Sequence, residues 1–157
     1  MFEFLNRKDY FIYSPVDGEI VSLEQIPDEV FSQRMMGDGF AVIPESQSVY
    51  APFDGEVKAI FPSKHAISLY TPTGIEYLIH IGLDTVELNG EGFEILVKEG
   101  DLFNQNQPLA KVNFDFIASQ NKSTMVIVVF PELEKRKPVV ELGKHAHGQK
   151  IGTLQKK

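Results

Sequence analysis

The segment Ser14–Leu23 reads SPVDGEIVSL, and the segment Ala51–Ile60 reads APFDGEVKAI, 37 positions later. Pro, Asp, Gly and Glu occupy the same places in both segments. Pro restricts the backbone φ before the turn, Asp-Gly reverses the chain with a glycine that tolerates positive φ, and a strand follows. The two copies predict an all-β fold: an antiparallel β-sandwich or barrel with internally duplicated strand–turn units.

The rest of the chain fits this class. The segment Val97–Val112 shows a third strand, glycine-centred turn and strand. Helix signals are sparse: Pro27–Met35 and Phe114–Asn121 predict a few short helices. No linker or low-complexity segment interrupts the sequence. We therefore expect a single domain over residues 1–157, with a flexible N-terminal segment at residues 1–12.

Composition narrows the classes of function. The 157 residues carry a net charge of −7, which argues against nucleic acid as the main partner because phosphate contacts need clustered Lys and Arg. The longest apolar run, Met125–Phe130, is too short to cross a bilayer, and the N-terminus has no signal-peptide pattern. These features predict a cytoplasmic protein that is not an integral membrane protein. The initiating Met and the Lys-rich end favour a free-standing chain.

Two of the four histidines lie on one predicted hairpin. HAISLY (65–70) and IEYLIH (75–80) are strand-like runs that flank TPTG at Thr71–Gly74. If those four residues form the loop, Tyr70 pairs with Ile75 and His65 sits directly opposite His80. Such partners have Cβ atoms about 4.5–5.5 Å apart, whereas a one-residue slip would send the rings to opposite faces.

The predicted surroundings of the two rings are apolar. With this register, Ile67 and Leu78 form the next pair on the histidine face. Partial desolvation lowers the pKa of an imidazole and favours the neutral ring, which is a competent nucleophile. Two histidines that serve only as satisfied core or edge residues remain the alternative.

At this point the sequence resembles a known family. GIEYLIHIGLDTV (74–86) is similar to the phosphorylation-site signature of the glucose-family IIA phosphocarriers of the bacterial phosphoenolpyruvate-dependent sugar phosphotransferase system. The similarity continues, in the same order, through GDGFAVIP (37–44), KHA (64–66) and LNGEGF (88–93), and it covers residues 13–152. The resemblance implies an antiparallel β-sandwich or barrel with short helices.

The resemblance also implies residue roles in a phosphotransferase component. His80 would accept a phosphoryl group from the phosphohistidine of HPr and pass it to the IIB domain of a sugar permease. His65 would donate to the phosphoryl oxygens, and Ser63, where family members often have Thr, would orient its ring. Regulatory protein partners are also implied. The docking positions would be the apolar Val30, Phe31, Met36, Phe61 and Leu78, with the acidic Asp28 and Asp84.

The resemblance requires no cofactor. Two facing imidazoles would nevertheless allow zinc at His65 and His80, with a partner's carboxylate completing the site.

Two other classes of protein share part of the pattern. HIGLD (80–84) and HAH (145–147) fit the His-x-Gly-x-Asp and His-x-His of zinc-dependent cell-wall peptidases, which have a related duplicated β architecture. However, VYAPFDG (49–55) precedes HIGLD instead of following it, and we expect HAH to lie in a solvated tail segment. EGDLFNQNQPLAKV (99–112) suggests a lipoyl- or biotinyl-like carrier, but its turn lacks the lysine that such carriers need.

Overall fold

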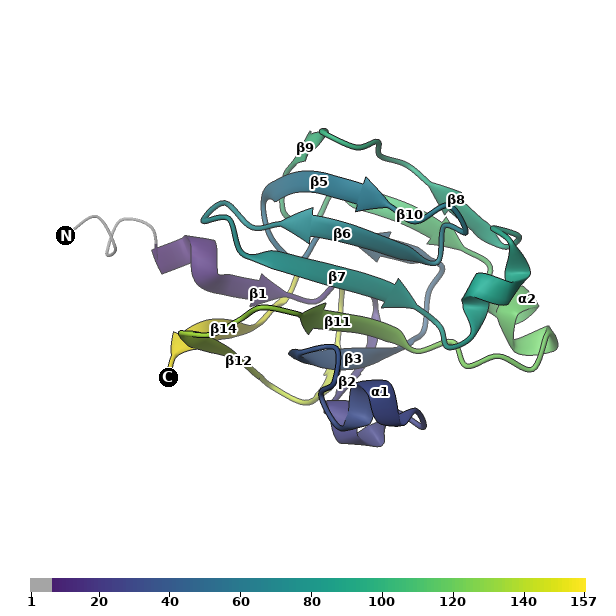
Figure 1. Ribbon diagram of the computed structural model, residues 1–157, viewed down its shortest axis with the longest axis horizontal. Helices are drawn as coiled ribbons and strands as arrows, with labels where there is room; N and C mark the ends of the chain where they lie inside the picture. The colour runs from purple at the N-terminus through teal and green to yellow at the C-terminus, as the bar shows by residue number, and fades with distance from the viewer. Residues whose placement is uncertain (1–6) are drawn as a thin grey trace.

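The computed structural model describes residues 7–157, and its largest sheet has eight strands (Figure 1). All strand pairs in this sheet are antiparallel. Their order is β13 (Gly143–His145), β2 (Gly18–Val21), β3 (Asp38–Pro44), β11 (Val126–Phe130), β7 (Glu76–Ile81), β6 (Ala66–Tyr70), β5 (Gly55–Ile60) and β9 (Leu102–Phe103).

Two three-stranded antiparallel sheets complete the fold. One has the order β1 (Phe11–Tyr13), β14 (Lys150–Lys156) and β12 (Arg136–Val140), and the other β4 (Ser48–Tyr50), β10 (Pro108–Val112) and β8 (Phe93–Ile95). The helices are short: α1 (Glu29–Ser32), α2 (Phe114–Ser119) and the 3-10 turns η2 (Arg7–Tyr10), η3 (Leu23–Gln25) and η4 (Thr85–Leu88). The predicted all-β antiparallel sandwich is confirmed.

The repeated strand–turn units occupy equivalent places in two halves of the molecule. The N–H of Tyr13 donates to the carbonyl of Pro52, and the N–H of Tyr50 donates to the carbonyl of Pro15. The two bonds are equivalent, because Tyr13 and Tyr50 are 37 positions apart in the repeat and so are Pro15 and Pro52. The sheet order has the same symmetry, because β2–β3–β11 and β5–β6–β7 run inward from the second strand on each side to a shared centre. The duplication seen in the sequence is therefore a duplication of structure.

Each Asp of the repeat anchors a turn from a distant part of the chain. Oδ1 of Asp54 accepts the N–H of Gln105 at 2.6 Å, and Oδ1 of Asp17 accepts the N–H of His147 at 2.8 Å. The halves differ in their next connection. Residues 22–37, between β2 and β3, contain η3 and α1, whereas the chain between β5 and β6 is a tight turn at residues 61–65.

The large sheet separates two apolar clusters. The main core lies between the large sheet and the two small ones and includes Tyr77, Ile79 and Ile81 of β7. A smaller cluster on the opposite face joins Leu78 of β7 to Phe31 of α1 and to the residues Leu23, Ile26, Ala41, Ala66, Leu83, Ile127 and Val129. Strand β7 thus contributes side chains to both faces, in the two-residue alternation of a strand.

The C-terminal segment is structured, and the prediction of a solvated tail at residues 145–147 is wrong. His145 is buried on β13, and His147 stacks on Tyr50 with ring centroids 3.7 Å apart. The following strand β14 buries Ile151 and Leu154 and is the middle strand of its sheet. A polar sequence forms this segment because backbone pairing and specific hydrogen bonds, more than apolar alternation, hold it.

The N-terminal segment that was expected to be flexible lies partly outside the described residues. Its described part forms η2 and the start of β1, where Ile12 is fully buried. The guanidinium of Arg136 stacks on the ring of Tyr10 at 3.5 Å. Within the described residues, the part of this segment from Arg7 to residue 12 is therefore ordered.

Candidate functional site

The hairpin of β6 and β7 has a register one residue away from the predicted one. Tyr70 pairs with Glu76, and Ala66, not His65, lies opposite His80. The loop is shorter because the N–H of Thr71 donates to the carbonyl of Ile75, which leaves three residues in the turn. Gly74 takes φ +85°, the left-handed residue that ends a three-residue hairpin loop. The predicted four-residue loop is therefore wrong.

The predicted pair of Ile67 and Leu78 is wrong for the same reason. Ile67 pairs with Ile79, and both belong to the main core on the face opposite the histidine. Leu78 does share a face with His80, and its partner on β6 is Ser68. The neighbours of His80 in the sheet are Ala66 and Ile127, both in the smaller apolar cluster.

The two imidazoles nevertheless meet, because His65 lies outside β6. It is the last residue of the β5–β6 turn, where Lys64 has φ +61°, so its side chain does not follow the alternation of the strand. The carbonyl of His65 accepts the N–H of Ile81 at 2.7 Å. The ring centroids of His65 and His80 are 5.0 Å apart, with an interplanar angle of 79°. The predicted proximity is confirmed, by a different local geometry.

A glycine carbonyl fixes the orientation and tautomer of His80. Nδ1 of His80 lies 2.8 Å from the carbonyl oxygen of Gly82. A carbonyl only accepts, so Nδ1 carries the proton and Nε2 keeps a free lone pair. Gly82 has φ +77°, and a Cβ there would lie 2.5 Å from Cγ2 of Thr85 and 2.7 Å from the carbonyl oxygen of Ser123. A glycine is thus required at the position that orients the ring.

Burial keeps both rings neutral near pH 7. Desolvation, with a smaller contribution from the nearby His65, lowers the pKa of His80 from 6.5 to about 4. The hydrogen bond to Gly82 and the charges of Asp28 and Asp84 oppose this shift. Desolvation also lowers the pKa of His65. The ring of His80 therefore offers an unprotonated nitrogen over the whole neutral range.

The surroundings of His65 favour the complementary tautomer, with the proton on Nε2. Its Nδ1 is buried and has no hydrogen-bond partner among residues 7–157. A buried N–H without a partner is rarer than a buried acceptor without one, which favours the proton on Nε2. Within the same residues Ser63 makes no hydrogen bond to the ring, so its orienting role stays a prediction. The pair thus combines a lone pair on His80 with an N–H donor on His65.

Aromatic side chains border the histidine pair on two sides. The ring centroid of Phe31 lies 5.1 Å from that of His80, and the centroid of Phe61 lies 5.7 Å from that of His65. Phe31 comes from α1 and Phe61 from the β5–β6 turn. The two connections that distinguish the halves of the duplicated fold therefore converge on the histidines.

The predicted docking residues divide into surface and supporting positions. Val30 and Phe61 are each 40% exposed, and Met36 is half-buried. Phe31 and Leu78 are only 5% and 6% exposed, which corrects the expectation that they form part of an exposed ring. They are buried because both pack in the smaller apolar cluster, where the ring of Phe31 also lies against that of His80. Among the five, Val30 and Phe61 are therefore the most exposed positions, and Phe31 and Leu78 lie buried in the smaller cluster.

The two predicted acidic positions flank the site on turns. The side chain of Asp28 caps α1 by accepting the N–H of Val30 at 2.9 Å. The short helix predicted from Pro27 therefore begins after that residue, because Pro27 precedes the N-cap. Asp84 is exposed and directly precedes η4 as its N-cap residue, with φ +59°.

Sequence reasoning missed part of the surface and its support. Met35, after α1, is 71% exposed, and Val86 of η4 is also exposed, so each is a large apolar side chain at the surface. The sequence did offer a signal for Met35, because it stands next to the predicted docking residue Met36. Arg34 and its acidic partners, Glu24 and Asp38, were also missed, because Glu24 lies ten positions away and the four-residue spacing to Asp38 does not fall within a helix.

The structure separates the residues of the peptidase motif. His145 lies on β13, and strands β2, β3 and β11 stand between β13 and β7, which carries His80. His147 is bound instead to Asp17 and Asn106. Residues 7–157 contain no group of three or more His, Cys, Asp or Glu that could hold a metal ion. His65 and His80 alone would supply half of a tetrahedral zinc site.

Fold and site together define a duplicated antiparallel β-domain that presents a neutral histidine pair at an apolar surface. Residues 10–136 match the family described as phosphoenolpyruvate-dependent sugar phosphotransferase system, EIIA 1. The chain belongs to this family, whose members carry phosphoryl groups in sugar uptake. The alternatives of a peptidase and of a lipoyl- or biotinyl-like carrier are not supported.

Relatives and a solved structure agree with this family. The chain is 49% identical over 141 residues to the PTS system glucose-specific EIICBA component of Staphylococcus carnosus, covering 89% of the chain and 21% of that protein. It is 50% identical to the glucoside-specific EIICBA component of the same organism, covering 89% and 20%. The chain thus spans about a fifth of the length of these relatives.

Among solved structures, the glucose permease IIA from Mycoplasma capricolum matches with a TM-score of 0.86 and 36% identity, over 90% of this chain and 93% of the other. The helices described at residues 7–157 include none with the length and apolarity needed to cross a bilayer.

Proposed function

We propose that this protein is a phosphohistidine carrier that accepts a phosphoryl group on Nε2 of His80 from phospho-HPr and passes it to the IIB domain of a sugar permease. The observation that carries the proposal is the histidine pair. The rings of His65 and His80 meet at 5.0 Å, and the Gly82 carbonyl leaves Nε2 of His80 as the free nucleophile.

The transfer needs positioning and charge stabilisation more than covalent assistance. The Nε2 lone pair of His80 forms the new P–N bond while the P–N bond to the donor histidine breaks and its electron pair returns to that nitrogen. The N–H of His65 donates to the phosphoryl oxygens, where charge is concentrated. The onward step to the IIB domain repeats this exchange in reverse, with His80 as the leaving group.

Apolar surroundings serve both docking and chemistry. Val30, Met36 and Phe61 form a shallow surface that suits brief contact with several partners. Phe31 and Leu78 support it from below, and a docked partner excludes water from the phosphohistidine. Asp28 and Asp84 lie beside this surface and would meet basic residues of the partners.

Neither step requires a cofactor. Zinc at His65 and His80 would need further ligands from a partner, such as a carboxylate, and would then act as a bridge between proteins. Regulatory partners could use the same surface. We further propose that residues 1–157 act as one IIA domain and, from the family, that the domain works in the cytoplasm, where its donor and acceptor would be found.

Mass spectrometry after incubation with phospho-HPr tests the proposal. The protein should gain one acid-labile phosphoryl group that maps to His80, and His80→Ala should abolish it. Persistent labelling of His80→Ala would remove the assignment.

The role of His65 has a separate test. His65→Gln should still accept the phosphoryl group, because the nucleophile is intact, but onward transfer to a IIB domain should fall by about 100-fold or more, the usual loss for an oxyanion donor. Full onward transfer would show that His65 takes no part in the chemistry. The same assay with Ser63→Ala tests whether its hydroxyl orients the ring.

A further inference from the structure

Arg34 occupies an unusual backbone position just beyond Gln33, the C-cap residue of α1. Its φ is +60°, in the left-handed region where Gly or Asn normally ends a helix. For a residue with a Cβ this conformation costs free energy, so contacts of the side chain must offset it. The N–H of Arg34 donates to the carbonyl of Phe31, and its own carbonyl accepts the N–H of Gly37.

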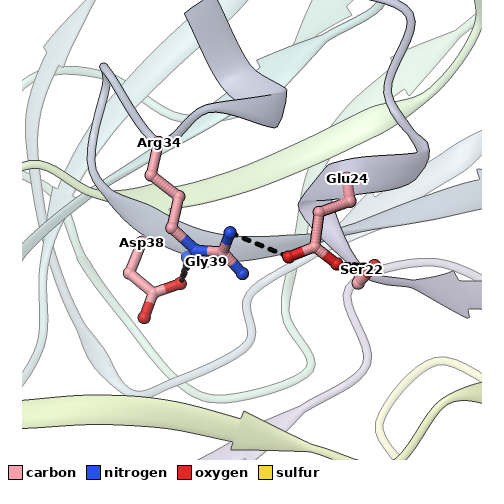
Figure 2. A network of polar contacts seen from close by, with 5 residues as sticks. All are labelled: Ser22, Glu24, Arg34, Asp38 and Gly39. Carbon is pink, nitrogen blue, oxygen red and sulfur yellow. Dashed lines mark hydrogen bonds and ion pairs between the residues drawn. The ribbon is translucent and has the colours of Figure 1, made fainter. Parts of the chain in front are cut away.

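The side chain of Arg34 joins the two ends of the β2–β3 connection (Figure 2). Its Nη1 lies 2.9 Å from Oε1 of Glu24 on η3, and its Nε lies 3.1 Å from Oδ1 of Asp38 at the start of β3. Ser22 donates to the other oxygen of Glu24, and Gly39 N–H donates to the Asp38 oxygen that Arg34 contacts. The guanidinium therefore closes the loop that contains α1.

This loop carries much of the proposed docking surface. Val30 and Met35 are exposed on it, and Phe31 packs against the ring of His80. Helix α1 has a single turn, which is too short to be stable by itself. Its place depends on the packing of Phe31 in the smaller cluster, and its ends are held by the Asp28 cap at the start and by the bridge of Arg34 after the helix.

We propose that Arg34 is a positioning residue for partner docking: by bridging Glu24 and Asp38, it holds the α1 loop in the shape that presents Val30 and Met35 beside His80. This inference rests on the proposed function, since it names what shapes the surface that phospho-HPr meets. The three side chains are substantially exposed, so the bridge acts on local order more than on global stability.

Kinetics of phosphoryl transfer test the role. In Arg34→Gln the KM for phospho-HPr should rise about 3- to 10-fold, the loss expected for one surface ion-pair network, while kcat stays within about twofold. Arg34→Gly, which suits the left-handed backbone but removes the guanidinium, should behave like Arg34→Gln. Arg34→Lys should be intermediate, because an ammonium does not reproduce the fork geometry.

Matched variants distinguish positioning by Arg34 from a direct contact between Arg34 and the partner. Glu24→Gln and Asp38→Asn should each raise the KM as well; if only the Arg34 variants do, Arg34 contacts the partner directly and the proposal is wrong. Lys58→Gln is the control. It removes an ion pair of similar exposure, to Glu76 at the start of β7 and away from His80 near its end, and it should leave the KM unchanged. Labelling of His80 by the small donor phosphoramidate should be unaffected in all these variants, because it needs no docking surface.

Amide exchange gives a readout that does not depend on transfer. The N–H of Met35 donates to the carbonyl of Val30 at 3.0 Å, and its exchange should be faster in Arg34→Gln than in the wild type. Unchanged exchange would overturn the inference. A wild type that takes no label from phospho-HPr would overturn the proposed function and the docking role together, whereas a labelled wild type with an unchanged KM in Arg34→Gln would overturn the role of Arg34 alone.

Discussion

At the scale of single residues, the site depends on the two ring nitrogens of His80: a hydrogen bond occupies Nδ1, and Nε2 is free. The carbonyl of Gly82 holds the Nδ1 proton of His80, so the reactive nitrogen is Nε2. The sequence could identify His80 and His65 as a pair. It could not choose the nitrogen, because the choice depends on where a backbone carbonyl lies after the chain turns at Gly82.

The lowered pKa of His80 predicts how stability depends on pH. Its pKa is about 4 in the folded state and 6.5 in its ordinary state, so the unfolded chain binds more protons between these values. The free energy of unfolding should therefore rise with pH from about 4 to 6.5 and lose this contribution, on the order of 2–3 kcal/mol, on acidification through the same window.

Urea unfolding of the wild type and of His80→Gln at several pH values measures this contribution. Both proteins share the titration of the carboxylates, and Gln does not titrate. The difference in unfolding free energy between the two should change between pH 6.5 and 4 and be constant above pH 7. A constant difference across the acid window would show that His80 is not desolvated in the folded state.

At the scale of secondary-structure elements, β7 is bounded by two glycines with different demands. Gly74 ends the hairpin loop before β7 with φ +85°, and nothing lies within 4 Å of a Cβ placed there. Gly82 follows β7 with φ +77°, and a Cβ there would overlap Thr85 and Ser123. Replacing Gly74 by a larger residue therefore lowers the free energy of unfolding through backbone strain alone. Replacing Gly82 lowers it through backbone strain and overpacking together.

Alanine at these two positions should separate those costs. Gly74→Ala should lower the free energy of unfolding by about 1–2 kcal/mol through backbone strain alone. Gly82→Ala should cost about 1–3 kcal/mol more through overpacking, and it should also slow the labelling of His80, since it moves the carbonyl that orients the ring. Thermal unfolding and the labelling assay check both; equal stability losses would show that overpacking at Gly82 adds nothing to the backbone cost.

At the scale of the whole molecule, the site lies where the duplicated halves meet and differ. Strands β7 and β11 form the centre of the large sheet (Figure 1). The β2–β3 connection brings Phe31 to this centre, and the β5–β6 turn brings His65 and Phe61. The duplicated sheet carries His80, and the unequal connections add His65 and the aromatic residues beside the pair.

The equivalence of the halves predicts equal roles for Asp17 and Asp54. Each accepts one backbone N–H from a distant segment, so Asp17→Ala and Asp54→Ala should each cost about 1.5–3 kcal/mol of unfolding free energy, the range for hydrogen bonds to charged groups. Asp101 accepts the N–H of the nearby Lys98 and serves as a matched control within one turn. Asp101→Ala should cost less, because the bond joins no distant segments.

Urea denaturation of the three variants measures these costs. Losses for Asp17→Ala and Asp54→Ala that differ by more than about 1.5 kcal/mol would contradict the structural equivalence. The double variant should lose the sum of the single losses if the two anchors act independently.

The sequence by itself determined the all-β class, the duplication and the pair of histidines. These follow from local chemistry: Pro-x-Asp-Gly turns the chain wherever it occurs, and two strand-like runs around TPTG must form neighbouring strands. Only the tertiary structure decided the hairpin register, the buried places of Phe31 and Leu78, and the anchoring of His147. The register depends on which backbone groups bond across the turn, a one-residue choice that the strand-like pattern of the two runs leaves open. The other two depend on contacts between residues far apart in the chain, such as the packing of Phe31 against His80 and the bond of Asp17 to His147, and periodicity along one segment carries no information about what packs on it.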